Sequence, residues 1–313
     1  MKNPFVTNGY VSPEYFCDRE KETAKIVSLL TNENNIALIS PRRLGKTDLL
    51  RHCFGQPEIK EHYHTFIIDI YATSSVRDFV NVFGKAVLDE LRPKGKSVWS
   101  TFLNVLASLR SEITFDMNGQ PTWGIGLGAI TNPSATLDEI FSYLNNAGKP
   151  CLIAIDEFQQ ITKYADDPNI EAALRTHIQR CSNAHFVFSG SHRHLMGAMF
   201  TSPARPFYQS VTLINLPPIS VDKYAEFCLK HFERVSKHLD TLVVTELYER
   251  FNGITSYMQK VMNILFSMTG TGEICIPSMI DTAINDLLDF SADTYDALLY
   301  QMPEKQRIVF MAI

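Results

Sequence analysis

The stretch that most constrains the fold of this chain is residues 34–50, NNIALISPRRLGKTDLL. Four apolar residues, Ile36–Ile39, are typical of a buried strand, and a polar loop separates them from a helix that we expect to begin at Lys46. A strand, a loop and a helix in this order form a phosphate-binding loop. In such a loop, backbone N–H groups and the positive end of the helix face the phosphates.

The loop contains the two side chains that phosphate binding requires. The ammonium group of Lys46 would contact the phosphates, and the hydroxyl of Thr47 would bind Mg²⁺. Ser40 stands where the pattern G-x-x-x-x-G-K-[ST] has its first glycine, so we expect a negative φ angle there. An accidental strand–turn–helix is the alternative interpretation. The residues predicted to contact nucleotide are Ser40, Pro41, Arg42, Arg43, Leu44, Gly45, Lys46, Thr47 and Asp48.

An acidic pair follows a second apolar run, in the sequence CLIAIDEF. Leu152–Ile155 is predicted to be a buried parallel strand, whose carboxyl end lies at the edge where ligands bind in open α/β sheets. Asp156 would hold Mg²⁺, a hard cation that prefers carboxylate and water oxygens. Glu157 would orient or deprotonate the attacking water. A capped strand end followed by a helix is the alternative.

The order of the predicted elements indicates an α/β fold. Five buried strands alternate with helices over residues 1–217, which predicts a three-layer P-loop NTPase core with a parallel five-stranded sheet. Asn118-Gly119 favours a β-hairpin inserted near residues 112–128. Helical segments without a competing strand then predict a small all-helical lid over 218–272 and a C-terminal helical segment over 273–313. A chain of 313 residues is long enough for two domains.

Composition argues against several classes of protein. The net charge of −5 gives no global basic field for nucleic acid. The six cysteines form no CxxC pair, which favours reduced thiols and a cytoplasmic location. The N-terminus lacks an apolar signal segment, and no run is long enough to cross a membrane, so no membrane partner is predicted.

Taken together, these motifs resemble the archaeal-type P-loop ATPase family, near the AAA+ and STAND ATPases of the additional-strand class. The resemblance spans about residues 5–290. It implies that Lys46 and Thr47 match the Walker A pair, and that ATP and Mg²⁺ are the cofactors. It also implies that Asp156 is the metal-binding aspartate and Glu157 the water-activating glutamate. The motifs that carry it are FCDRE at 16–20, SPRRLGKT, LIAIDEF, FSGS, ARPFYQ, LPPIS and NGITSYMQ.

Further roles follow from the resemblance. Arg205 stands where AAA+ relatives carry an arginine that reaches a neighbouring subunit's γ-phosphate, which implies self-association. The alternative is a loop arginine paired with a surface acid. Ser189 or Ser191, at the tip of the strand beside that of Asp156, would sense the γ-phosphate, with Arg193 as a further candidate. The candidates for an adenine pocket are Tyr15, Phe16, Arg19 and Gly253, although these aromatic rings would equally cover an edge of the sheet.

The leading hypothesis is an Mg²⁺-dependent ATPase that acts as a conformational switch on an unknown protein partner. ATP or ADP would lie between the core and the lid, and hydrolysis would release the lid. One alternative is an ATPase subordinate to DNA binding, with a winged-helix-like part beginning at Met302. Another is a nucleotide-stabilised scaffold with little turnover. The guanine-reading pattern N-K-x-D is missing, which favours adenine.

Overall fold

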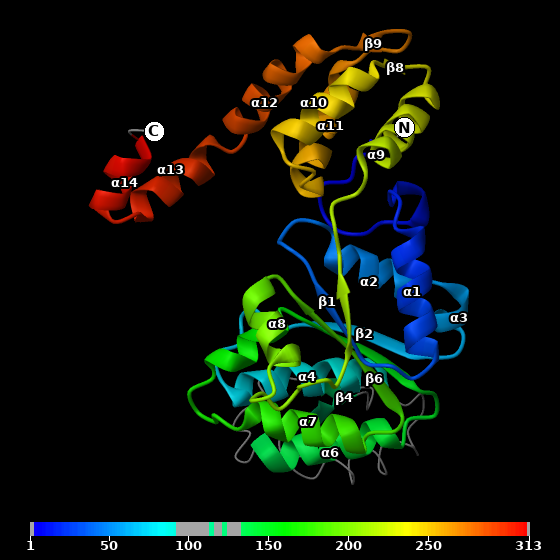
Figure 1. Ribbon diagram of the computed structural model, residues 1–313, viewed down its shortest axis with the longest axis vertical. Helices are drawn as coiled ribbons and strands as arrows, with labels where there is room; N and C mark the ends of the chain where they lie inside the picture. Colours follow the sequence, from blue (N-terminus) through cyan, green and yellow to red (C-terminus); the bar gives the residue numbers. More distant parts are fainter. Residues whose placement is uncertain (1–2, 92–112, 116–120, 124–132, 312–313) are drawn as a thin grey trace. The chain divides into compact units, whose positions relative to one another are not determined.

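The chain folds into two compact units (Figure 1). The computed structural model describes residues 3–91, 113–115, 121–123 and 133–311. Arg19–Pro217 form one unit, which we call the core unit. Met1–Asp18 and Pro218–Ile313 form the other, which we call the helical unit. The sequence analysis had assigned the N-terminal segment to the core, whereas the structure groups it with the helices after Pro217.

A parallel five-stranded sheet forms the centre of the core unit, as predicted. Its order is β2-β5-β6-β1-β7, so β6 lies between the strand of the phosphate-binding loop and the strand of the acidic pair. Every residue of β1, β5 and β6 is buried, which is typical of parallel strands covered on both faces. The strands are β1 Ile36–Ile39, β2 His64–Asp69, β5 Cys151–Asp156, β6 Ala184–Gly190 and β7 Thr212–Asn215.

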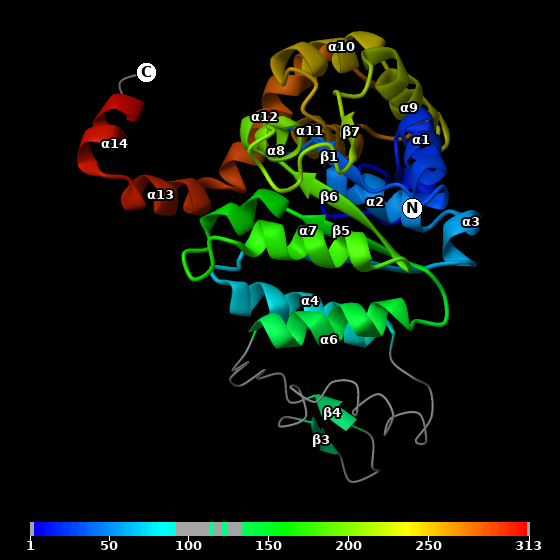
Figure 2. The same ribbon diagram turned by 60° about the horizontal axis from the view of Figure 1, so that its bottom comes forward.

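Helices cover both faces of this sheet, giving the three predicted layers (Figure 2). Successive side chains of a strand point to opposite faces, so Ala37 and Ile39 join the large aromatic cluster under α4, α6, α7 and α8. Ile36 and Leu38, also fully buried, lie outside that cluster. The helices are α1 Glu20–Thr31, α2 Lys46–Phe54, α3 Pro57–Lys60, α4 Val76–Glu90, α6 Pro133–Asn145, α7 Ile170–Arg180 and α8 Arg193–Thr201; the 3-10 helix η3 spans Phe158–Lys163.

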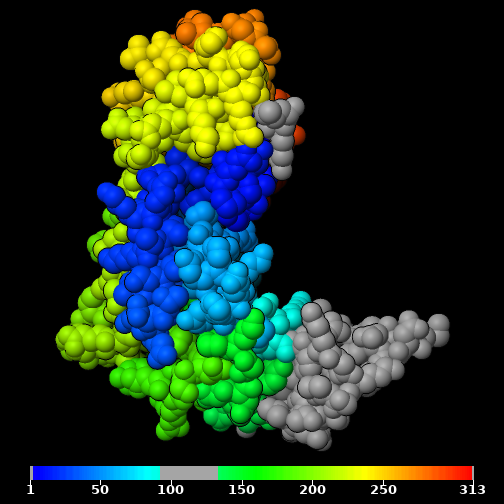
Figure 3. Space-filling view, turned by 90° about the vertical axis from the view of Figure 1, so that its right-hand side faces the viewer, coloured from blue at the N-terminus to red at the C-terminus, as the bar shows by residue number. Residues whose placement is uncertain are grey.

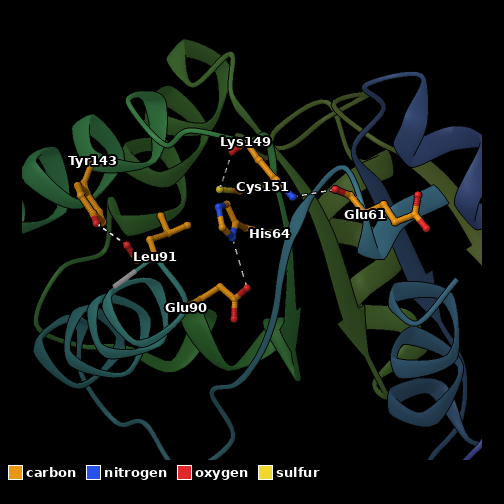
Figure 4. Close-up of polar contacts among 7 residues, drawn as sticks. All are labelled: Glu61, His64, Glu90, Leu91, Tyr143, Lys149 and Cys151. Carbon is orange, nitrogen blue, oxygen red and sulfur yellow. Dashed lines mark hydrogen bonds and ion pairs between the residues drawn. The ribbon is translucent and has the colours of Figure 1, made fainter. Parts of the chain in front are cut away.

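The amino-terminal ends of β2 and β5 are fastened by polar contacts to the segments beside them (Figure 4). His64, the first residue of β2, has its Nδ1 3.5 Å from Glu90 Oε1 at the end of α4. Lys149 Nζ, just before β5, donates to the carbonyl of Glu61 at 2.8 Å. The Tyr143 hydroxyl of α6 donates to the carbonyl of Leu91 at 2.8 Å. The first two contacts lie at the end of the sheet opposite its carboxyl edge, and the third joins α6 to the end of α4.

The predicted hairpin insertion is described only in part. Strands β3 (Ile113–Phe115) and β4 (Pro121–Trp123) pair antiparallel, with Ile113 opposite Trp123, as expected for a hairpin. The Asn118-Gly119 turn and the rest of the predicted 112–128 insertion lie outside the described residues.

The helical unit contains the helices that periodicity predicted, together with two strands that it did not. Each strand has only two residues, too few to show an alternating pattern, and they pair in parallel. Neither α13 nor α14 buries a residue. The elements are η1 Pro13–Tyr15, α9 Val221–Glu233, β8 His238–Leu239, α10 Thr241–Arg250, α11 Thr255–Met268, β9 Ile274–Cys275, η4 Pro277–Met279, α12 Ile280–Asp289, α13 Ala292–Gln301 and α14 Glu304–Met311.

Phe5 explains why the N-terminal segment belongs to the helical unit. Its side chain is fully buried, with ring centroids 6.0, 5.9 and 5.6 Å from those of Phe227, Phe232 and Phe266. Burying one phenylalanine side chain contributes about 1.5–3 kcal/mol. The amide of Asn263 also donates to the carbonyl of Phe5 at 2.7 Å. Figure 3 shows this segment, in dark blue, against the yellow helices.

Among the described residues, no helix combines the length and the apolar character needed to cross a bilayer. The six cysteines are all buried, and none forms a disulfide in the described chain.

Candidate nucleotide-binding site

The loop between β1 and α2 has the backbone of a phosphate-binding loop. Helix α2 begins at Lys46, as predicted, and Gly45 before it has a φ of 83°. Arg43 also has a positive φ, of 70°, whereas Ser40 is not among the positive-φ residues. The expected absence of a positive φ angle at Ser40 is therefore confirmed. A Cβ at Gly45 would meet nothing within 4 Å, so the backbone angle, not space, favours glycine there.

Lys46 is held inside its own loop. Its Nζ donates to the carbonyls of Ser40 and Pro41 at 3.1 and 3.2 Å, and the residue is 7% exposed. Burial lowers the pKa of Lys46 from its ordinary value, while the carboxylates of Asp156 and Glu157 act in the opposite direction. Among the described residues, the ammonium group thus donates hydrogen bonds to neutral acceptors only. An incoming polyphosphate would offer it stronger, charge-assisted hydrogen bonds.

The hydroxyl of Thr47 in α2 contacts the carboxylate of Asp156 at the end of β5. Thr47 Oγ1 donates to Asp156 Oδ2 at 2.5 Å, and the backbone N–H of Glu157 donates to Asp156 Oδ1 at 3.0 Å. No group of three or more His, Cys, Asp or Glu side chains that could hold a metal is found in the part of the chain that the structure describes. A cation at Thr47 and Asp156 would therefore need phosphate and water oxygens to complete its shell. Mg²⁺ is usually bound in this way, so the residues present fit it.

Glu157 turns the chain out of β5 with a φ of 54°, in the left-handed region. Its Oε2 accepts hydrogen bonds from Gln159 Nε2 at 2.5 Å and from Ser191 Oγ at 2.8 Å. Sequence reasoning had named Glu157 and Ser191 but missed Gln159. The only signal was a polar residue two positions after Glu157. Side chains two residues apart do not face each other on a helix, so this signal did not predict a contact between Gln159 and Glu157.

The three γ-phosphate candidates are placed differently. Ser191 contacts Glu157 directly. Ser189 is fully buried opposite Leu38 of β1, and its Oγ has no hydrogen-bond partner in the described chain. Arg193 is exposed at the first position of α8. The structure therefore brings Ser191, but neither of the other two, into contact with the acidic pair.

Arg205 pairs with a carboxylate of its own unit. Its Nη2 contacts Glu171 Oε1 on α7. Glu171 is 8% exposed, and burial raises its pKa, while the Arg205 guanidinium lowers it. An ion pair with an acidic residue was the predicted alternative to an arginine finger. The acid in this pair is buried, whereas a surface acid was expected. The finger stays a prediction.

Replacing Arg205 separates these two roles. Arg205→Ala is expected to lower the free energy of unfolding by about 1–3 kcal/mol, since the Glu171 carboxylate would stay buried without its partner. Urea denaturation measures this loss, and adding Glu171→Gln should recover part of it. Arg193→Ala, at an exposed position, is the control. Unchanged stability together with lost ATP turnover would instead support the arginine finger.

The adenine-pocket candidates belong to two units. Tyr15 stacks on His231 at 5.8 Å, and Phe16 packs edge-on against Tyr10 at 5.6 Å, both within the helical unit. Gly253 of the same unit has a φ of 68°. Arg19, in the core unit, is 3% exposed and already has protein partners. The adenine pocket stays a prediction.

Several solved structures share the fold of this chain. Among solved structures, a Walker-type ATPase of Pyrococcus abyssi superposes with a TM-score of 0.61 at 17% identity, covering 95% of this chain and 79% of that one. The Orc1 protein of Aeropyrum pernix, solved in complex with DNA, gives 0.60 at 12% identity, covering 96% and 72%. The ORC2 protein of the same organism gives 0.60 at 14%, covering 91% and 71%. At these identities the likeness shows the fold alone.

A comparison with curated proteins gave no match. A family model described as an ATPase domain predominantly from Archaea matches residues 16–261, well over half of the chain. That range includes the phosphate-binding loop, the acidic pair and all five strands of the central sheet. The chain therefore belongs to this family of P-loop ATPases found predominantly in Archaea.

Proposed function

We propose that the core unit binds ATP and hydrolyses it in an Mg²⁺-dependent reaction, and that the chain uses this reaction as a conformational switch. The observation that carries the proposal is the hydrogen bond between Thr47 and Asp156. Lys46 is the sequence neighbour of Thr47, and Glu157 is the sequence neighbour of Asp156. A lysine for the phosphates, oxygen ligands for a cation and a carboxylate for water thus occupy one edge of the sheet. Membership of an ATPase family supports the same reaction.

Each side chain has a distinct part in this proposal. Lys46 exchanges the carbonyls of Ser40 and Pro41 for phosphate oxygens and neutralises their charge. Glu157 accepts a proton from the attacking water or orients it toward the γ-phosphate. Ser191 lies beside Glu157, where its hydroxyl would also reach the transferred phosphoryl group.

Thr47 and Asp156 are the residues that would hold Mg²⁺. When bound, the cation neutralises the charge on the β- and γ-phosphates. The short Thr47–Asp156 hydrogen bond keeps the two ligands together before any cation arrives.

The proposal predicts phosphate release that requires both ATP and a divalent cation. Purified chain supplied with ATP and Mg²⁺ should release inorganic phosphate, and addition of excess EDTA should reduce the rate to background, as measured by a coupled phosphate assay. Typical turnover numbers of phosphoryl-transfer enzymes are about 1–100 per second for kinases and far lower for unassisted GTPases. ATP binding without phosphate release would contradict the hydrolysis and would favour the nucleotide-stabilised scaffold.

The switch part of the proposal is supported by how the chain passes between its units. It crosses twice, at residues 18–19 and 217–218. Arg19, at the first crossing, has a φ of 79°, and its Nη2 donates to the carbonyl of Pro217, at the second, at 2.7 Å. The buried side chain of Arg19 thus links the two residues of the core unit at which the chain enters and leaves it. A change at the end of the sheet could therefore reach both connections together.

A second candidate function is an ATPase that serves DNA binding, and it is favoured by the structural likeness to the Orc1 protein solved with DNA. The net charge of −5 weighs against it. DNA binding that weakens steeply with rising salt would support this candidate over the protein-directed switch.

A further inference from the structure

The carboxylate of Glu157 is restrained at one oxygen by two neutral donors. Gln159 Nε2 and Ser191 Oγ both donate to Oε2, from the segments that follow β5 and β6. Oε1 accepts no hydrogen bond from the described part of the chain, and the residue is half-buried. The two donors therefore fix the direction of the carboxyl group and leave its other oxygen for a water molecule.

Gln159 is a rigid donor because it is built into the core. The residue is 3% exposed, and its Oε1 lies in the protein interior without a hydrogen-bond partner among the described residues. A Cβ on Gly190 would collide with that Oε1 and with the side chain of Met196. Glycine at the end of β6 thus makes room for the amide. A carboxylate only accepts hydrogen bonds, so the amide nitrogen, not the oxygen, must face Glu157.

The backbone at Glu157 is what brings the two side chains together. A non-glycine residue in the left-handed region costs roughly 1–2 kcal/mol, and such strain is often found at functional sites. Here the positive φ of Glu157 is followed at once by the 3-10 helix η3. The tight turn folds residue 159 back toward residue 157. An α-helix beginning at the same place would have kept them on different faces.

We propose that Gln159 is a positioning residue for Glu157: its buried amide holds the carboxylate in the orientation in which it activates water. The inference rests on the proposed function, since Glu157 needs positioning only if the chain hydrolyses ATP. Ser191 completes the restraint from the neighbouring strand, and its exposed fraction of 9% leaves it nearer to the solvent edge than Gln159. Gln159 is the more deeply buried of the two donors.

The main test is Gln159→Met, which keeps the length of the side chain and removes the N–H donor. We expect kcat for phosphate release to fall about 10- to 100-fold, because small displacements of a reacting group have effects of this size. The dissociation constant for ATP, measured with a fluorescent analogue, should change by less than about threefold, since the amide does not contact the phosphate-binding loop. Thermal melting should stay close to that of the wild type, because the variant also removes a buried amide oxygen that has no partner.

Gln160→Met is the matched control. It changes the same residue type at the next position, where the amide donates to the carbonyl of Thr73 at 2.8 Å and not to Glu157. Its kcat should stay within about threefold of the wild type.

Gln159→Glu tests whether residue 159 lies against the carboxylate of Glu157. Two carboxylates held side by side disfavour ionisation of both. The acidic limb of the kcat profile should then move to higher pH, with activity recovering as the pH is raised. Gln160→Glu should leave the profile in place.

The possible results distinguish failure of the positioning role from failure of the proposed ATPase function. If kcat is unchanged or increased in Gln159→Met, or falls equally in Gln160→Met, the positioning role is wrong while the proposed ATPase stands. If the acidic limb does not move in Gln159→Glu, the same conclusion follows. If the wild-type chain binds ATP but releases no phosphate, the proposed function fails, and the positioning role fails with it.

Discussion

Lys46→Ala is expected to weaken ATP binding at least about 100-fold, a loss of roughly 2.7 kcal/mol. The ammonium group of Lys46 lies inside the loop, shielded from water, and its present partners are two neutral carbonyls. It is therefore available to the phosphates in surroundings that strengthen electrostatic attraction. Titration with a fluorescent ATP analogue measures the effect.

Arg51→Ala is the matched control for this experiment. It removes one positive charge from the same helix, α2, but from a side chain that is 50% exposed and pairs with Asp48 at 3.8 Å. Screened surface pairs of this kind contribute little, so its ATP affinity should be near that of the wild type. An ATP affinity that survives Lys46→Ala would show that the loop does not bind the phosphates.

Glu157→Gln is expected to reduce ATP turnover about 10²- to 10⁴-fold while ATP binding is retained. The amide keeps the shape of the side chain, and its oxygen can still accept from Gln159 and Ser191. It can no longer take a proton from water. Single-turnover phosphate release measures the rate, and Glu58→Gln, at an exposed position of α3, is the control. Unchanged hydrolysis would assign the base to another group.

The Glu157→Gln variant also provides a test of the proposed switch. Because Glu157→Gln should hold ATP without consuming it, a fluorophore pair placed on the two units should keep its ATP-dependent signal. In the wild type that signal should decay as ATP is hydrolysed. A signal that is the same with ATP, with ADP and without nucleotide would remove the switch from the proposal and leave the ATPase.

Much of the core could be predicted because its signals are local. Ile36–Ile39 and the start of the helix at Lys46 agree with the structure to the residue, since a fully buried parallel strand is an unbroken apolar run. The acidic pair at the end of β5 was equally visible, because it interrupts such a run abruptly. The central sheet and its three layers followed from the order of these elements.

What could not be predicted depends on contacts between distant segments or on single backbone angles. Apart from Cys17, the core that contains Phe5 is formed by residues more than 200 positions later in the chain, and no local pattern reports such contacts. Arg205 and Glu171 are likewise paired only by the fold. Gln159 reaches Glu157 because of one positive φ angle at a non-glycine residue, which residue preferences alone would have disfavoured.

The burial of Phe5 has a consequence for how the chain can be divided into fragments. The stretch that the family shares begins at residue 16 and ends at residue 261, within α11. Phe5 lies before that stretch and its neighbour Phe266 lies after it, yet the two rings share one hydrophobic core. The stretch that the family model matches and the folded unit therefore have different boundaries. A fragment cut at the family boundaries would lose both rings and the second half of α11 from the centre of the helical unit.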